Sequence, residues 1–176
     1  NVKYMIDGKK ISQEVLGKLK QEIEQKKLKL RLVAVLVSAH LGIKKFVELK
    51  GKAAEEVGIE YEIVELPETI SELELKKEVR KLVENDNNDG VLVELPFPEG
   101  INVQNVLNEI SLEKDVDVLS QKAQDKFYSN TSVILPPAVE AVRTVLEFHG
   151  IDIKNKKVAV FGHGLLVGKP VAHWLS

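Results

Sequence analysis

The strongest constraint on the fold is an uninterrupted apolar segment, residues 32–37, in which valine alternates with leucine and alanine. Such a run is typical of a strand covered on both faces, as in a parallel sheet. The segments on either side, residues 11–27 and 43–57, place their apolar side chains at helical spacing. A buried strand between two amphipathic helices predicts a parallel sheet with helices on its faces.

The same alternation continues along the chain. Residues 60–66 are expected to form a strand, and a capping box of Ser71 and Glu74 starts the next helix. Residues 90–95 form a third expected strand, which ends at two prolines because proline cannot donate a ladder hydrogen bond. The remaining expected elements are a short helix over residues 102–110, a less regular stretch over 113–135 and a helix over 137–148.

A further buried strand is expected over residues 157–161, and it runs into a glycine-rich turn. The candidate cofactor-binding residues in this turn are Gly162, His163, Gly164, Val167 and Gly168. A strand, a glycine-rich turn and a helix start are the layout of a dinucleotide-binding site. The third glycine comes one residue later than in the usual spacing, so a tight turn without a ligand remains an alternative.

We therefore predict an α/β chain with two parts. The first is a three-layer N-terminal lobe with a mostly parallel sheet, residues 1–136. The second, residues 137–176, is a linking helix and the first strand, turn and helix of a Rossmann-like domain. One strand and one helix cannot bury both faces of a parallel sheet, so we expect this second domain to be incomplete.

Composition excludes several classes of function. The 25 basic and 27 acidic residues nearly cancel, and no basic stripe suggests a nucleic-acid partner. There is no cysteine, the histidines have no second ligand at metal spacing, and no metal is expected. The apolar runs are too short to span a bilayer and no signal peptide is evident, so we expect a cytoplasmic protein without a membrane partner.

Several segments, taken in order, resemble the bifunctional methylenetetrahydrofolate dehydrogenase/methenyltetrahydrofolate cyclohydrolase family. The matching segments are MIDG at residues 5–8, FVELKGK at 46–52, EEVGI at 55–59, GVLVELPFP at 90–98, EKDVD at 113–117, LP at 135–136, FHGI at 148–151 and VGKP at 167–170. The resemblance implies oxidation of 5,10-methylenetetrahydrofolate with NADP, or with NAD as the alternative cofactor, and hydrolysis of the methenyl product to 10-formyltetrahydrofolate. It also implies a homodimer for the full-length protein.

The resemblance assigns roles to individual residues. Lys50 stands at the place of the family's catalytic lysine, and Glu94 stands where a glutamine usually orients that lysine. Phe46 replaces a tyrosine that packs on the folate rings, and Asp117 matches the aspartate that binds the pterin. The prolines Pro96 and Pro98 are expected to pack on the substrate, whereas Glu113, Lys114 and Asp115 are expected to face solvent.

The departures from the family pattern leave alternatives open. A carboxylate at Glu94 would pair with Lys50 and hold it in its charged form. Val118 replaces a glycine, Ala138 replaces a threonine, and His163 replaces an arginine that suits the 2′-phosphate of NADP. One alternative is therefore a folate-binding relative that has lost catalysis. Another is a different two-lobed dehydrogenase, such as one acting on shikimate, although its motifs find no match here.

Overall fold

The computed structural model describes residues 5–37 and 41–176. The elements, in chain order, are α1 Gly8–Lys26, β1 Leu30–Val37, α2 Leu41–Glu56, β2 Ile59–Leu66, α3 Glu72–Glu84, β3 Gly90–Val93, α4 Val103–Leu107, α5 Gln121–Tyr128, α6 Pro137–Phe148 and α7 Gly168–Trp174. The helices and strands that the sequence predicts between residues 11 and 110 all have a counterpart in this order, from α1 to α4.

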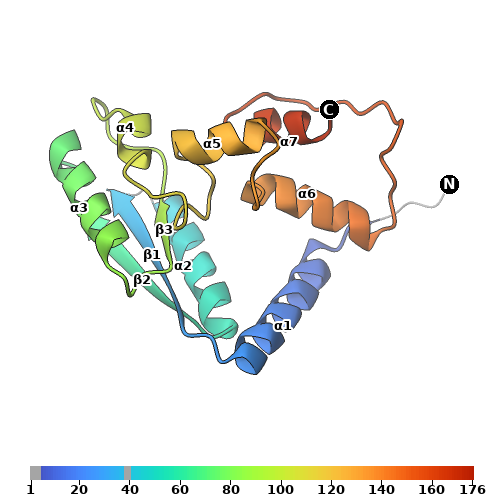
Figure 1. Ribbon diagram of the computed structural model, residues 1–176, viewed down its shortest axis with the longest axis horizontal. Coiled ribbons are helices and arrows are strands. Elements are labelled where there is room, and N and C mark those ends of the chain that lie inside the picture. The colour runs from blue at the N-terminus through green and yellow to red at the C-terminus, as the bar shows by residue number, and fades with distance from the viewer. Residues whose placement is uncertain (1–4, 38–40) are drawn as a thin grey trace.

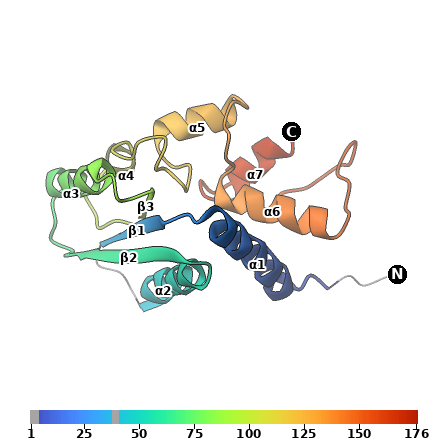
Figure 2. The same cartoon turned by 60° about the horizontal axis from the view of Figure 1, so that its bottom comes forward.

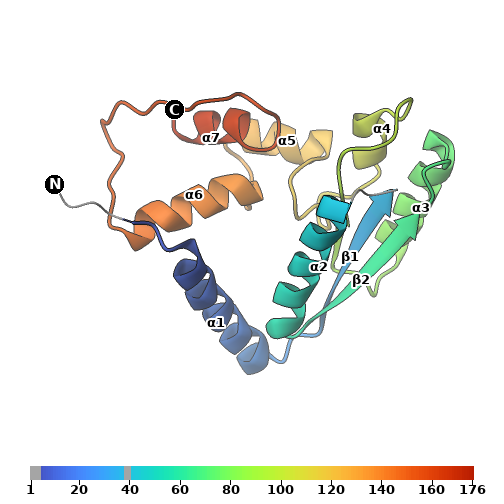
Figure 3. The ribbon, with the colours of Figure 1, turned by 180° about the vertical axis from the view of Figure 1, so that it is seen from behind.

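The sheet has three parallel strands in the order β2-β1-β3, so the uninterrupted apolar strand β1 lies at its centre. Because side chains alternate across a strand, Val35 and Val37 pack with α3 and α4, whereas Ala34 and Leu36 pack with α2. Figures 1 and 3 show α2 and α3 on opposite sides of the sheet. The predicted three-layer α/β lobe with a parallel sheet is confirmed.

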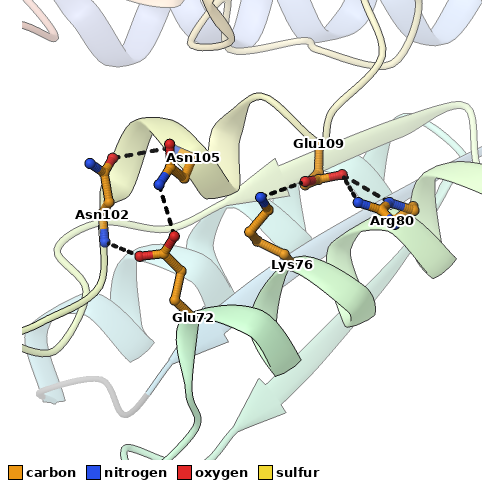
Figure 4. A network of polar contacts seen from close by, with 6 residues as sticks. All are labelled: Glu72, Lys76, Arg80, Asn102, Asn105 and Glu109. Carbon is orange, nitrogen blue, oxygen red and sulfur yellow. Dashed lines mark hydrogen bonds and ion pairs between the residues drawn. The ribbon is translucent and has the colours of Figure 1, made fainter.

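Hydrogen bonds and ion pairs connect the segment after β3 to helix α3 (Figure 4). Ser71 and Glu74 form the predicted capping box at the start of α3. The carboxylate of Glu72 accepts hydrogen bonds from the Asn102 backbone N–H and from Asn105 Nδ2, each at 2.8 Å. These bonds hold the start of α4 against α3, which fixes the path of the chain from β3 toward the acidic segment 113–117.

In the structure, helices α5, α6 and α7 pack together, and residues 118–176 are called the second part of the chain from here on. A core of Val118, Ala123, Phe127, Val139 and Val171 joins α5, α6 and α7. Helix α1 contacts both α2 and α6, and Figure 2 shows it beside α6. The two parts of the chain therefore meet through α1 as well as through the segment that follows β3.

Two expectations about this second part were wrong. Helix α5 lies within the stretch predicted to be less regular; Ser120 caps it, and Ala123 and Phe127 form its buried stripe. Residues 157–161 form no strand, and Val158 and Phe161 are exposed, Phe161 by 97%. A parallel strand needs neighbouring strands for its backbone hydrogen bonds, and no described residue pairs with this segment.

Within residues 5–37 and 41–176, no helix is both long and apolar enough to cross a membrane.

Candidate active site

Helix α2 presents one face to a cavity, and that face carries two of the predicted site residues. Phe46 and Lys50 lie one turn apart and both line the cavity, together with Gly42 and Ile43. The Phe46 side chain is 56% exposed. The Lys50 ammonium lies 4.9 Å from the centroid of the Phe46 ring, which is close enough for a cation–π contact. The helix therefore offers an open aromatic face beside a cation.

Glu94 brings a carboxylate to Lys50 from the end of the sheet. Its backbone N–H donates to the Val35 carbonyl at 3.0 Å, which continues the β3 ladder by one residue. Alternation from Leu92 turns the Glu94 side chain toward α2. There Lys50 Nζ donates to Glu94 Oε1 at 2.7 Å, and the Glu94 side chain is only 9% exposed. The expected ion pair between Lys50 and Glu94 is present.

Asp115, rather than facing solvent, organises the loop that carries Asp117. The Asp115 side chain is buried and accepts from the backbone N–H groups of Leu119 at 3.1 Å and Ser120 at 2.7 Å. Lys114 is also engaged, because its Nζ donates to the carbonyls of Val83 and Asn85. The expectation of solvent-facing side chains was wrong for these two residues and holds for Glu113, which is exposed.

Val118 explains why this loop position favours glycine. Its φ angle is 58°, in the left-handed region that side chains branched at Cβ rarely adopt. The side chain is nevertheless buried, in the core shared with α5, α6 and α7. Burial of an apolar side chain therefore offsets a strained backbone, and the loop keeps the turn that directs Asp117 into the cavity.

The pKa of Asp117 is raised above the ordinary aspartate value. Burial of the carboxylate is the main cause, because it disfavours the charged form. The positive charge of Lys50 acts in the opposite direction, while the negative charges of Glu94 and Asp115 raise the pKa further. A hydrogen-bond donor from a ligand would satisfy this desolvated carboxylate.

The opposite wall of the cavity comes from the second part of the chain. Phe127 and Tyr128 of α5, Pro137 at the start of α6 and Val167 of the glycine-rich turn are among its lining residues. The predicted site residues that line the cavity are Phe46, Lys50, Glu94, Asp117 and Val167. The predicted residues that lie outside the lining are Pro96, Pro98, Gly162, His163, Gly164 and Gly168.

Sequence reasoning missed the residues of α5 because it missed the helix. Gln124, Phe127 and Tyr128 line the cavity, and the charge of Lys169 lies 5.2 Å from the Tyr128 ring centroid. The signal that could have found them is the serine cap at Ser120 followed by apolar residues at helical spacing. Leu95 also lines the cavity beside the cis Leu95–Pro96 bond, in place of the two prolines.

The glycine-rich turn is formed even though the strand before it is not. Gly162 has a φ of 96°, and a Cβ on Gly168 would lie 2.2 Å from the Gly162 carbonyl oxygen. The start of α7 can therefore pack against Gly162 only because position 168 lacks a side chain. His163 is exposed and space around Gly164 is open. These features fit a backbone that a dinucleotide can approach closely.

The described residues contain no group of three or more side chains that could together bind a metal ion.

The sequence of this chain matches the model of one protein family. The model for the tetrahydrofolate dehydrogenase/cyclohydrolase catalytic domain matches residues 6–117, more than half of the chain. The chain belongs to this family. The match covers Phe46, Lys50, Glu94 and Asp117, so it includes the α2, β3 and loop contributions to the cavity.

Named proteins and solved structures similar to this chain support its assignment to the tetrahydrofolate dehydrogenase/cyclohydrolase family. Bifunctional protein FolD of Moorella thermoacetica is 37% identical over 174 residues, covering 97% of this chain and 62% of that protein. FolD of Macrococcus caseolyticus is 34% identical over 175 residues, covering 98% and 62%. The crystal structure of the bifunctional enzyme FolD from Campylobacter jejuni has a TM-score of 0.92 at 30% identity and covers 98% of this chain and 62% of that one.

This family member thus spans about three fifths of the length of the relatives it matches.

Proposed function

We propose that the protein oxidises 5,10-methylenetetrahydrofolate to 5,10-methenyltetrahydrofolate with NADP, and then hydrolyses the methenyl product to 10-formyltetrahydrofolate. The observation that carries this proposal is the meeting of Lys50, Glu94 and Asp117 in one cavity, whose opposite wall includes Val167 of the glycine-rich turn. A cavity between two lobes can hold a folate and a dinucleotide face to face.

The first lobe supplies the groups that would hold the folate. The open ring of Phe46 can stack on a flat heterocycle without offering it a hydroxyl. Asp117 can accept hydrogen bonds from a ring N–H and an exocyclic amine of the pterin in a fork. Such a ligand would provide hydrogen-bond donors to this desolvated carboxylate. Leu95, which lines the cavity in the segment after β3, would contact the substrate in place of the expected Pro96 and Pro98.

Lys50 is the residue to which we assign proton handling, with Glu94 as its partner. Hydrolysis of the methenyl group requires that the attacking water lose a proton and that a folate nitrogen gain one. Lys50 is placed at the cavity surface by two contacts, the ion pair to Glu94 and the ring of Phe46. These contacts restrict the lysine, so its ammonium is oriented before substrate binds.

The glycine-rich turn would hold the cofactor through Gly162, His163, Gly164, Val167 and Gly168. NADP, when bound, accepts a hydride from the one-carbon bridge of the folate. The relative from Trypanosoma brucei, 29% identical with a TM-score of 0.91, was crystallised with NADP and an inhibitor. The exposed His163 would be a weaker partner for a 2′-phosphate than arginine, so NAD is the second cofactor to test.

We further propose a homodimer for the full-length protein and a cytoplasmic location. Light scattering on the purified protein tests the dimer, because its mass would be twice that of one chain.

The decisive experiment follows reduction of each cofactor by absorbance, using the product of the complete gene with 5,10-methylenetetrahydrofolate and either NADP or NAD. Lys50→Ala should lower the rate by at least about a hundredfold, as loss of a general acid–base group does. Lys52→Ala is the matched control, because Lys52 is exposed on the same helix and lies outside the cavity lining.

The outcome separates the proposed enzyme from its alternatives. Turnover that Lys50→Ala abolishes and Lys52→Ala preserves would support the proposal and identify the cofactor. A folded protein that binds folate but reduces neither cofactor would instead be a binding relative without catalysis. Failure to bind folate at all would reject the proposed substrate.

A further inference from the structure

Gln124 belongs to the face of helix α5 that lines the cavity. It lies one helical turn before Phe127 and Tyr128, which line the same wall. Its Nε2 donates a hydrogen bond to the backbone carbonyl of Leu119 at 2.7 Å. Because Leu119 comes two residues after Asp117, this bond attaches the Gln124 side chain to the loop that carries the carboxylate proposed to bind the pterin.

The bond to Leu119 also determines which end of the Gln124 amide remains available. A backbone carbonyl can only accept a hydrogen bond, so the amide must present its NH2 group to Leu119 and direct its oxygen elsewhere. That oxygen, Oε1, has no hydrogen-bond partner among the described residues. The side chain is only partly buried and lines the cavity, so this acceptor is available to a ligand.

A second amide donates to the same Leu119 carbonyl. Gln104 of α4 donates to it through Nε2 at 3.2 Å, and the same Nε2 donates to Asn108 Oδ1 at 2.9 Å. Asn108 Oδ1 also accepts from the backbone N–H of Gln121, at the start of α5, at 2.8 Å. The carbonyl that orients Gln124 is therefore held by α4 and α5 before any ligand binds.

The other polar side chains of the cavity are engaged differently. The described lining residues with polar side chains are Lys50, Glu94, Asp117, Gln124 and Tyr128. Lys50 and Glu94 form an ion pair with each other at 2.7 Å. The ring of Tyr128 packs against His173 of α7, with 5.0 Å between the two ring centroids. Asp117 and Gln124 therefore remain as two acceptors that one loop joins.

The proposed substrate carries a group that Asp117 alone cannot satisfy. The exocyclic amine of a pterin has two N–H bonds, and a fork to one carboxylate uses one of them together with the ring N–H. The other N–H would be buried without a partner in a cavity lined mostly by apolar side chains, which is unfavourable.

We propose that Gln124 is a further binding residue of this site, whose Oε1 accepts the second N–H of the exocyclic amine. The inference rests on the proposed function, because it takes a pterin as the ligand. Asp117 and Gln124 together recognise an amine that keeps both of its hydrogens, so a substituent on this amine removes a hydrogen bond to the protein.

Gln124→Met tests the inference, because methionine keeps the length of the side chain and removes the amide. Calorimetric titration of the product of the complete gene with tetrahydrofolate should show binding weakened about three- to tenfold, as expected for one lost hydrogen bond. Gln121→Met is the matched control, since Gln121 is exposed on the same helix and lies outside the cavity lining. The affinity for NADP should be the same in both variants and in the parent.

The N2-methyl analogue of tetrahydrofolate separates a direct contact from a change in the loop. The parent should bind this analogue about three- to tenfold more weakly than tetrahydrofolate, whereas Gln124→Met should bind the two ligands equally within about twofold. A variant that still discriminates between them as the parent does, or that binds tetrahydrofolate as tightly as the parent, would overturn the inference alone. A parent protein that binds no tetrahydrofolate would reject the proposed function and the inference with it.

Discussion

At the scale of single residues, the carboxylate of Asp117 lies where burial opposes its charge. Its raised pKa means that the folded chain holds the proton more tightly than the unfolded chain. The contribution of Asp117 to stability is therefore fully present below its unfolded pKa and is lost as the pH rises through its folded pKa. The proposed function requires an ionised carboxylate at position 117, whereas burial makes the neutral form of this side chain more favourable in the folded state.

Asp117→Asn should raise the thermal midpoint at pH 8, because the amide removes the buried charge, and the gain should shrink as the pH falls toward 4. Tetrahydrofolate affinity should fall about ten- to a hundredfold, as expected for lost charge-assisted hydrogen bonds. Thermal unfolding across this pH range and calorimetric titration measure the two effects. Glu113→Gln, at an exposed position in the same loop, is the control. A lower midpoint for Asp117→Asn at pH 8 would contradict the argument.

The family resemblance pointed to Lys50, Glu94 and Asp117, which the structure brings to one cavity, but physical reasoning alone could not tell Asp117 from Asp115. Both carboxylates lie in one short acidic segment, and only the folded turn decides which one accepts backbone hydrogen bonds. The packing of the Tyr61 ring against Gly51 is likewise invisible in the sequence. It depends on the pairing of β2 with β1 and on the missing side chain at Gly51.

At the scale of elements, Glu109 links the end of the α4 segment to helix α3. Its carboxylate pairs with Lys76 at 3.1 Å and with Arg80 at 2.8 Å, and its side chain is 15% exposed (Figure 4). Burial alone would raise the pKa of Glu109, but hydrogen bonds from Arg80 and Lys76 and their charges lower it below the ordinary value. The resulting stability is present above the ordinary glutamate pKa and is lost as the pH falls through the lowered one.

Glu109→Gln should lower the free energy of unfolding at pH 7 by about 1–3 kcal/mol, between the values typical of exposed and buried ion pairs. The difference from the parent should diminish when the pH falls below the lowered pKa. Urea denaturation at pH 7 and at pH 3 measures it. Glu78→Gln provides the comparison, because the ion pair between Glu78 and Lys81 is exposed and 3.7 Å long. Equal effects of the two substitutions would show that the α4 attachment does not depend on Glu109.

Elements with strong local signals could be predicted from the sequence. The capping box of α3 and the apolar run of β1 each specify their structure within a few residues. Helix α5 has only eight residues, and its apolar stripe is short, so loop composition around it masked the signal. The expected strand at 157–161 failed for a different reason, since strand formation depends on partners far away in the chain.

At the scale of the whole molecule, two phenylalanines of the second part have opposite environments. Phe127 is 4% exposed and joins α5 to α6 and α7, whereas Phe161 is 97% exposed. Phe127→Ala should cost about 3–5 kcal/mol of unfolding free energy, and Phe161→Ser should change it by less than about 0.5 kcal/mol. Urea denaturation of this 176-residue chain measures both. A large cost for Phe161→Ser would mean that residues 157–161 are packed.

The close contact between Gly51 and Tyr61 means that two positions in different elements cannot be chosen independently. A helix interior ordinarily prefers alanine to glycine by about 1 kcal/mol, yet alanine at 51 would collide with the ring at 61. Alanine at position 51 would fit if the side chain at position 61 were smaller than tyrosine. Random mutagenesis one site at a time would therefore find neither change favourable, and a useful library of this protein has to vary the two codons together.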